Sequence, residues 1–240
     1  MRYQAIVEYD GTRYSGFQSQ PNVNSIQDQI ERALRLMTQQ EVRIFGSGRT
    51  DKGVHAVAQS IHFDFDSYLD SDTWVKSLNK RLPGDIRIKK VTNKPNSFHA
   101  RHSVKSKIYK YVLSKKELSA FENNYMVYDA HFDLSRVLGA INDLVGTHDF
   151  FGLSKYVEGK ETIRTIYSIK IKETKNTITF FFHGNGFLKY MVRSIMGLII
   201  EIGCNRKPTD TIKEVLETKN RNLAGKTAPA CGLYLVKVFY

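Results

Sequence analysis

The stretch VRIFGSGRTDKGVHAVAQSIHFDF, residues 42–65, joins two predicted strands through a loop that holds three glycines in eight positions. Residues 42–45 predict a short strand, and the alternation from Val57 to Phe65 is typical of a half-buried one. The glycines indicate unusual backbone angles or a ligand that approaches the backbone closely. The stretch therefore predicts two strands joined by a sharp glycine loop.

Outward from this loop, the predicted elements occur in a similar order in the two halves of the chain. Ser25 and Asp28 form a capping box that begins the first helix, and Gly203 stops the most apolar one. The predicted strands are residues 3–9, 42–45, 57–65, 86–91, 104–113, 165–173, 177–183 and 233–239. Five helices are predicted. The first begins at Ser25, and the second centres on Trp74, Leu78 and Leu82 and ends at Pro83-Gly84. The other three span residues 134–145, 187–202 and 210–217.

This pattern favours an α+β architecture, because hairpin-like neighbours are common and regular crossovers are too few for a parallel sheet. We expect two similar halves, each an antiparallel or mixed sheet with helices, flanking a basic active-site cleft. A boundary near residue 103 gives an N-terminal half, 1–103, that carries the glycine loop. The C-terminal half, 104–240, is then expected to complete the cleft.

The charge of the chain indicates a partner rich in phosphate. Lys and Arg number 36 against 24 Asp and Glu, which gives a net charge of +12. From Arg87 to Lys116, ten Lys and Arg occur without a single acid, and Phe98, Tyr109 and Tyr111 lie among them. Nucleic acid suits such a surface, since cationic side chains release its counterions. The alternative is a surface whose charge only keeps the protein soluble.

Several other classes of protein are excluded or disfavoured. The one sustained apolar stretch, Ile195 to Ile200, is far shorter than the ~20 residues that span a bilayer. The N-terminus lacks the apolar region of a secretory signal, so we expect a cytoplasmic protein. Cys204 and Cys231 form no CxxC pair and predict neither a disulfide framework nor a cysteine zinc site.

Asp51 is the strongest candidate for chemistry in the glycine loop. The loop is not a nucleotide-phosphate loop, because Gly48 and Gly53 have the spacing of one but lack the following Lys-Ser/Thr. Asp51 lies between Arg49 and Lys52 on a turn that glycine allows to be sharp, so its carboxylate could be kept ionised and presented outward. The alternative is a turn aspartate that makes a local hydrogen bond.

The seven histidines do not have the spacing of a metal site, and we expect no metal. His55, four residues after Asp51, could serve in acid–base chemistry or act as a structural hydrogen bonder. Arg193 lies inside the predicted apolar helix but off its Met191/Ile195/Leu198 stripe. It is either on a solvated face or a buried counter-ion for a carboxylate.

Several colinear segments, which together cover essentially the whole chain, resemble the tRNA pseudouridine synthase A family. They are Gly48-Arg49-Thr50-Asp51 with Gly53-Val54-His55-Ala56, Phe98-His99-Ala100-Arg101, Lys107 through Tyr111, Gly146 through Phe150, Asn185 through Gly197, and Ala224 through Ala230 with Gly232 through Leu235.

The resemblance implies isomerisation of uridine to pseudouridine in the anticodon arm of tRNA, at the positions conventionally numbered 38 to 40. It implies no cofactor. Asp51 matches the family's catalytic aspartate, Tyr109 its active-site tyrosine, and Arg193 the basic partner of that aspartate. Leu233 matches an apolar residue that packs near the target base, and Arg49 a motif arginine that positions the substrate.

The family also implies a homodimer that holds tRNA in positive clefts across both subunits. Lys52 stands where the family often has a small residue, and the pair Lys189-Tyr190 also departs from the family pattern, which bears on tRNA selectivity. Two other functions remain open. One is an RNA-binding protein without catalysis, and the other is a metal-dependent nuclease that uses Asp51 and His55.

Overall fold

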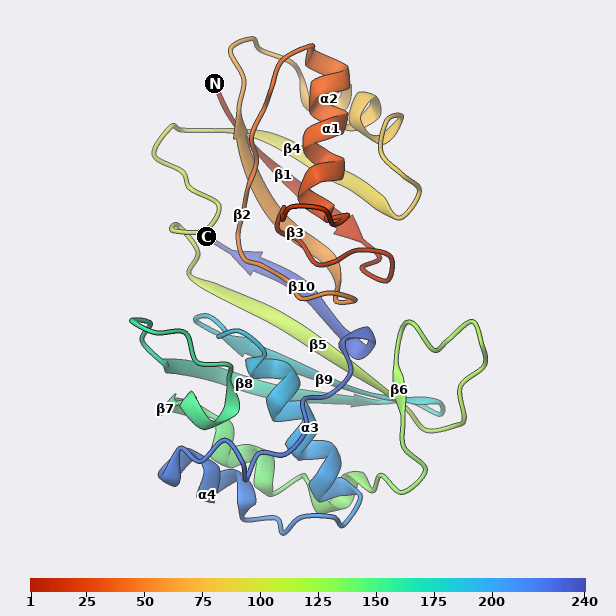
Figure 1. Cartoon of the computed structure of the whole chain (residues 1–240), viewed down its shortest axis with the longest axis vertical. Coiled ribbons are helices and arrows are strands. Elements are labelled where there is room, and N and C mark those ends of the chain that lie inside the picture. The colour runs from red at the N-terminus through yellow and green to blue at the C-terminus, as the bar shows by residue number, and fades with distance from the viewer. The chain divides into compact units, whose positions relative to one another are not determined.

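The computed structural model describes all residues, 1–240, and they divide into two units (Figure 1). The first unit comprises Met1–Lys105 together with Tyr234–Tyr240, and the second comprises Ser106–Leu233. The predicted division at residue 103 assigns the strand that begins at Leu233 to the second half. In the structure that strand continues into the first unit, so one stretch of chain serves both.

The sheet of the first unit has the order β4-β1-β3-β10, and β2 pairs with β3. Strand β1 is antiparallel to both β3 and β4, whereas β10 runs parallel to β3, with Tyr234 opposite His55. Helices α1 and α2 lie side by side against this sheet (Figure 1). The bounds are β1 Arg2–Tyr9, α1 Ile26–Thr38, β2 Phe45–Gly46, β3 His55–Asp64, α2 Ser71–Asn79, β4 Ile86–Lys94 and β10 Leu233–Phe239.

The capping box at the start of α1 is confirmed. The Ser25 hydroxyl accepts a hydrogen bond from the Asp28 amide at 3.1 Å and donates to the Asp28 carboxylate at 2.6 Å. Ile26, Ile30 and Leu34, which recur at helical spacing, are buried on one face of this helix. The capping box was therefore sufficient to place the start of the helix, and the spacing of the apolar residues explains its core face.

Two predictions in the first unit are wrong in detail. The strand expected at 42–45 is only the two residues of β2, because the Ile44 amide donates to the Glu31 carboxylate at 2.9 Å rather than to a strand. Helix α2 ends at Asn79 rather than near Leu82. The Asn79 side chain instead bonds the backbone of Ile88 in β4, through donor and acceptor contacts of 2.9 and 2.8 Å.

The sheet of the second unit has the antiparallel order β5-β9-β8-β7, and the short β6 runs parallel beside β5. Helix α3 is buried almost all round, since eleven of its thirteen residues are inaccessible. The bounds are β5 Ser106–Ser114, β6 Val127–Tyr128, β7 Gly146–Asp149, β8 Ile163–Glu173, β9 Thr177–Gly184, α3 Met191–Gly203 and α4 Thr211–Thr218. Short 3-10 helices occur at Leu134–Arg136, Ala140–Leu144, Phe151–Leu153 and Ala230–Gly232.

The helix predicted over 134–145 is not an α-helix. Two 3-10 turns, on either side of Gly139, replace it, and Asp133 caps the first of them through the Ser135 amide at 2.9 Å. Helix α3 begins at Met191 rather than Phe187, because Tyr190 has a left-handed φ of +63° that a helix cannot contain.

Each unit therefore combines a largely antiparallel sheet with two α-helices, which confirms the α+β prediction. None of the helices has both the length and the apolar character that crossing a membrane requires.

Candidate active site

Asp51 opens a tight turn between β2 and β3. The Val54 amide donates to the Asp51 carbonyl at 3.1 Å, and Gly53, the third residue of the turn, has a positive φ of +77°. A residue other than glycine or asparagine would be strained there. The Asp51 side chain is half-buried. The glycine loop therefore forms the sharp turn that its composition predicts.

A second loop, which connects β1 to α1, packs directly against this turn. A Cβ on Gly11 would lie 2.0 Å from the Val54 carbonyl oxygen, and one on Gly16 would lie 2.7 Å from that of Thr50. Gly16 also has a positive φ of +104°. The Phe17 amide donates to the Thr50 carbonyl at 3.1 Å. Backbone thus packs on backbone, an arrangement that no side chain larger than hydrogen permits at these glycines.

Gln59 holds the first part of the same loop. Its side chain is completely buried on β3. The Ser47 hydroxyl donates to its amide oxygen at 2.6 Å, and its amide nitrogen donates to the Gly48 carbonyl at 2.9 Å. Both polar ends of this buried side chain are used to fix the loop, so residues 47 and 48 have little freedom.

His55 lies at the base of the loop and has the contacts of a structural residue. Its side chain is buried, and its Nδ1 lies 3.1 Å from both the Gly11 amide and the Asp10 carboxylate. Its ring stacks on Tyr234 of β10, with centroids 4.6 Å apart. These contacts tie the loop to β1 and β10, and they favour the structural hypothesis for His55 over the acid–base one.

Arg49 and Lys52, on either side of Asp51, have exposed side chains. Cations at the surface of a fixed loop are available to phosphate oxygens of a ligand. The structure therefore leaves Arg49 in a position compatible with the substrate-positioning role that the resemblance implies.

Tyr109 and Arg193 belong to the second unit. Tyr109 lies on β5, opposite Phe182 of β9, and is largely buried. Its ring meets the Phe187 ring edge to face, with centroids 5.1 Å apart. Its burial and its contact with Phe187, in the segment before α3, restrict the orientation of the phenol ring.

Arg193, the third residue of α3, is half-buried and held from two sides. Its Nε donates to the Ala228 carbonyl at 2.9 Å, and the Ala228 amide donates back to the Arg193 carbonyl at 3.0 Å. The guanidinium lies over the Tyr190 ring, 5.2 Å from its centroid. A Cβ on Gly197 would lie 2.0 Å from the Lys226 carbonyl oxygen, so this loop packs directly on the helix. Arg193 is therefore a partly exposed side chain held by specific contacts, and its role as a counter-ion stays a prediction.

Leu233 is the first residue of β10 and is buried. The segment before it is fixed by Tyr111, whose hydroxyl donates to the Pro229 carbonyl at 2.8 Å and whose ring packs against Gly232. Leu233 therefore lies on the same short segment as Ala228, the residue that binds Arg193, and Tyr111 anchors this segment.

The structure thus places Asp51 and Arg49 in the first unit, and Tyr109, Arg193 and Leu233 in the second. Sequence reasoning missed the supporting residues Gly11, Gly16, Gln59 and Ala228. Two glycines soon after the first predicted strand were a readable signal of close packing, whereas nothing in the sequence marked Gln59.

Comparison with known proteins gives one consistent result. A family model described as tRNA pseudouridine synthase matches residues 5–103 and 140–240. The tRNA pseudouridine synthase A of Aster yellows witches'-broom phytoplasma is 41% identical over 238 residues, 99% of this chain and 98% of that protein. Those of Limosilactobacillus reuteri and Anoxybacillus flavithermus are each 42% identical, over 100% of this chain and 96% and 98% of their own lengths.

Proposed function

We propose that this chain, which belongs to the tRNA pseudouridine synthase family, converts uridine to pseudouridine in the anticodon arm of tRNA, at positions 38 to 40. Membership of the family makes the chain an isomerase that acts on tRNA. The target positions and the residues that carry the reaction are the proposal. The observation that carries it is the Asp51 loop, a fixed turn within a region that the family model matches.

Asp51 is the proposed catalytic residue. The reaction breaks the C1′–N1 bond, rotates the retained uracil, forms a C1′–C5 bond and removes the proton from C5. A carboxylate can act as a nucleophile at C1′ or C6, or as a base at the 2′ carbon. All three routes need an ionised side chain on a fixed backbone. The packing of the turn around Asp51 supports the second of these needs. The three routes remain alternatives.

The other predicted residues have complementary roles in this proposal. Arg193 supplies the cation that favours the ionised form of Asp51. Tyr109 stacks on the extruded base and helps to move the C5 proton, and Leu233 lies on the opposite face of that base. Arg49 positions the substrate. The proposal includes no cofactor and no metal.

The charge of the chain supports tRNA as the partner. The +12 net charge and the acid-free stretch from Arg87 to Lys116 provide many cations for phosphate contacts. Such contacts offset the few kcal/mol that extruding a base costs. We further propose that the protein acts in the cytoplasm as a homodimer that binds tRNA across both subunits.

Release of tritium from tRNA labelled at uracil C5 tests the reaction directly. We expect the wild-type protein to release tritium without added metal or nucleotide, and site mapping to place pseudouridine at positions 38 to 40. The Asp51→Ala and Asp51→Asn variants should bind tRNA with unchanged affinity and release none. Both substitutions remove the carboxylate and leave the Asp51 carbonyl that closes the turn.

The other outcomes separate the alternatives. Full activity of Asp51→Ala contradicts the role of Asp51. Salt-sensitive tRNA binding by the wild type, with no pseudouridine formed on any of several tRNAs, supports the RNA-binding protein without catalysis. Strand cleavage that EDTA abolishes supports the nuclease.

A further inference from the structure

The second unit contains a pocket of about 360 Å³ beside the start of α3. Phe151, Tyr156 and Tyr190 supply aromatic rings to its wall, and Lys155, Ser194 and Arg221 supply polar groups. No carboxylate lines it. Its volume is in the range of small-ligand sites. We call it the Tyr156 pocket.

The cations of the Tyr156 pocket have no acidic partner. Arg221 donates to the Gly225 carbonyl at 2.9 Å, to the Thr227 hydroxyl at 3.1 Å and to the Ser194 hydroxyl at 3.5 Å. A guanidinium has five N–H donors, so two remain for a ligand. All three acceptors are neutral, and the positive charge of Arg221 is fixed in place without being compensated. Lys155 is exposed and forms no ion pair. A ligand of this pocket should therefore carry negative charge.

The aromatic residues of the pocket offer flat apolar surface. The Phe151 and Tyr156 rings contact each other with centroids 5.2 Å apart, yet the two residues remain 36% and 50% exposed. Exposed rings on which bases stack, next to cations that contact phosphate, are the usual means by which proteins hold single-stranded nucleic acid. A flat ring joined to a phosphate fits both parts of the pocket.

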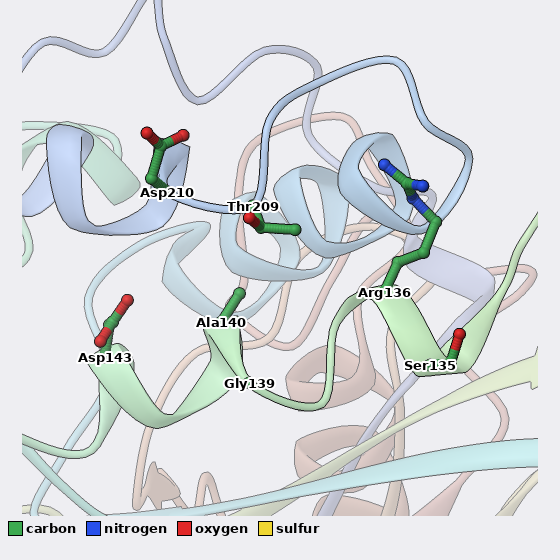
Figure 2. Close-up of a pocket in the computed structure, with 7 residues that line it drawn as sticks. All are labelled: Ser135, Arg136, Gly139, Ala140, Asp143, Thr209 and Asp210. Carbon is green, nitrogen blue, oxygen red and sulfur yellow. The ribbon is translucent and has the colours of Figure 1, made fainter.

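A larger hollow in the same unit has the opposite character. It measures about 580 Å³, and Figure 2 shows Asp143 and Asp210 on one side of it and Arg136 on the other. Arg136 bonds the Ile202 carbonyl and the Asn205 side chain. The two carboxylates would repel a phosphate, and the Arg136 guanidinium is already hydrogen-bonded to the protein. The larger cavity is therefore the less suitable site for a nucleotide.

We propose that the Tyr156 pocket binds one nucleotide of the tRNA other than the uridine that is isomerised. The Phe151 and Tyr156 rings are inclined by 48° to each other, so the base stacks on Tyr156 and meets Phe151 at its edge, while its phosphate contacts Lys155 and Arg221. This inference rests on the proposed function. Tyr190, which lines the pocket, also carries the Arg193 guanidinium on its ring. The nucleotide therefore lies close to the residue that we propose as the counter-ion of Asp51, and it helps to fix the RNA near the reacting uridine.

Substitutions at two exposed positions test the pocket. In an Asp51→Asn background, tRNA binding is measured over a range of salt concentrations. Tyr156→Ala should raise Kd about tenfold with an unchanged salt dependence, because it removes stacking but no charge. Tyr156→Phe keeps the ring and should bind normally. Lys155→Ala should weaken binding and lower the slope of log Kd against log salt by about one.

Lys175→Ala is the matched control, because Lys175 is an exposed lysine of the same unit in the turn between β8 and β9. It should leave Kd unchanged. In the active protein, Tyr156→Ala should raise KM for tRNA and leave kcat unchanged, since the contact is equally present before and during the reaction.

The outcomes distinguish this inference from the function on which it rests. If the wild type forms pseudouridine while Tyr156→Ala and Lys155→Ala both bind like Lys175→Ala, the pocket proposal is overturned and the enzyme assignment stands. If the wild type forms no pseudouridine on any tRNA, the proposed function fails, whatever the pocket variants do.

Discussion

The supports of Asp51 and Arg193 show two ways of fixing a charged side chain. Asp51 lies on irregular chain, and two loops brace each other through glycines at 11 and 16. Arg193 lies on a regular helix, and one loop is attached to it through Ala228. In the first case the backbone angles themselves depend on the packing. In the second the hydrogen bonds of the helix set the backbone angles, and the contact with the loop sets only the side chain. The Asp51 region should therefore tolerate less change.

Among changes to the residues around Asp51, loss of the Arg193 cation should have the largest effect on turnover. We expect Arg193→Leu to lower kcat about a hundredfold, the size of effect seen when one electrostatic partner of a reacting group is removed. Arg193→Lys, which keeps the charge but not the Nε bond to Ala228, should retain more activity. Tritium release at saturating tRNA is the measurement. Unchanged turnover in Arg193→Leu means that Arg193 is not the counter-ion of Asp51.

Gly11→Ala should be the most damaging change in the bracing of the loops. Its methyl group would lie 2.0 Å from the Val54 carbonyl oxygen, so the turn that Asp51 opens must move. We expect the free energy of unfolding to fall by about 1–3 kcal/mol. We also expect the variant to lose most of its activity. The control is Gly84→Ala, where a methyl group meets nothing within 4 Å. Equal melting temperatures for the two variants would contradict the bracing role of the Gly11 contact.

Gly197→Ala should cost less, although its methyl group meets the Lys226 carbonyl at the same 2.0 Å. Alanine stabilises a helix interior by about 1 kcal/mol relative to glycine, and this offsets part of the clash. Helix α3 should persist while the loop at Ala228 shifts. Gly139→Ala, in open space, is the control. Thermal melts of all four glycine variants rank the two regions, and a larger loss for Gly197→Ala than for Gly11→Ala would reverse the comparison.

A smaller effect is expected from pH, which should change the stability of the first unit more than that of the second. Burial lowers the pKa of His62, on β3, from its usual 6.5 to about 4, with further contributions from His99 and Arg2. Between these pH values the unfolded chain binds a proton that the folded chain does not. Stability should therefore be complete above pH 6.5 and decline as the pH falls toward 4.

Hydrogen exchange at pH 7.5 and pH 5 measures this effect separately in each unit. Amides of β3 should lose protection at the lower pH, and His62→Gln should reduce that loss. Equal loss of protection in β3 and α3, unchanged in His62→Gln, would show that the pH dependence has another source.

Local sequence signals predicted much of the fold. The Ser25 capping box and the alternation over residues 57–65 are properties of neighbouring residues, and they located α1 and β3 closely. The prediction that β3 is half-buried is wrong, because Ser60 and His62 on its second face are buried as well, and Ser60 there accepts a hydrogen bond from the Tyr240 hydroxyl. The failures came from tertiary contacts. The Glu31 carboxylate takes the Ile44 amide away from the predicted strand, and nothing near residue 44 indicates this.

The same distinction applies to the candidate site. Asp51 was identifiable because the glycines that shape its turn lie next to it in the sequence. The environment of Arg193 was not, because its carbonyl partner, Ala228, lies 35 residues away. The left-handed Tyr190 that precedes α3 has no local signature either, since tyrosine rarely adopts that angle. The colinear resemblance supplied the roles, which residue types alone could not.

The return of β10 to the first unit has a consequence for biosynthesis. A ribosome delivers residues 1–105 well before Tyr234 and its neighbours, with the whole second unit in between. Until then β3 lacks its parallel neighbour, His55 lacks the ring on which it stacks, and Ser60 lacks the Tyr240 hydroxyl. During synthesis the edge of β3 that pairs with β10 therefore stays unpaired. The Asp51 loop gains its last support only after the second unit has been synthesised.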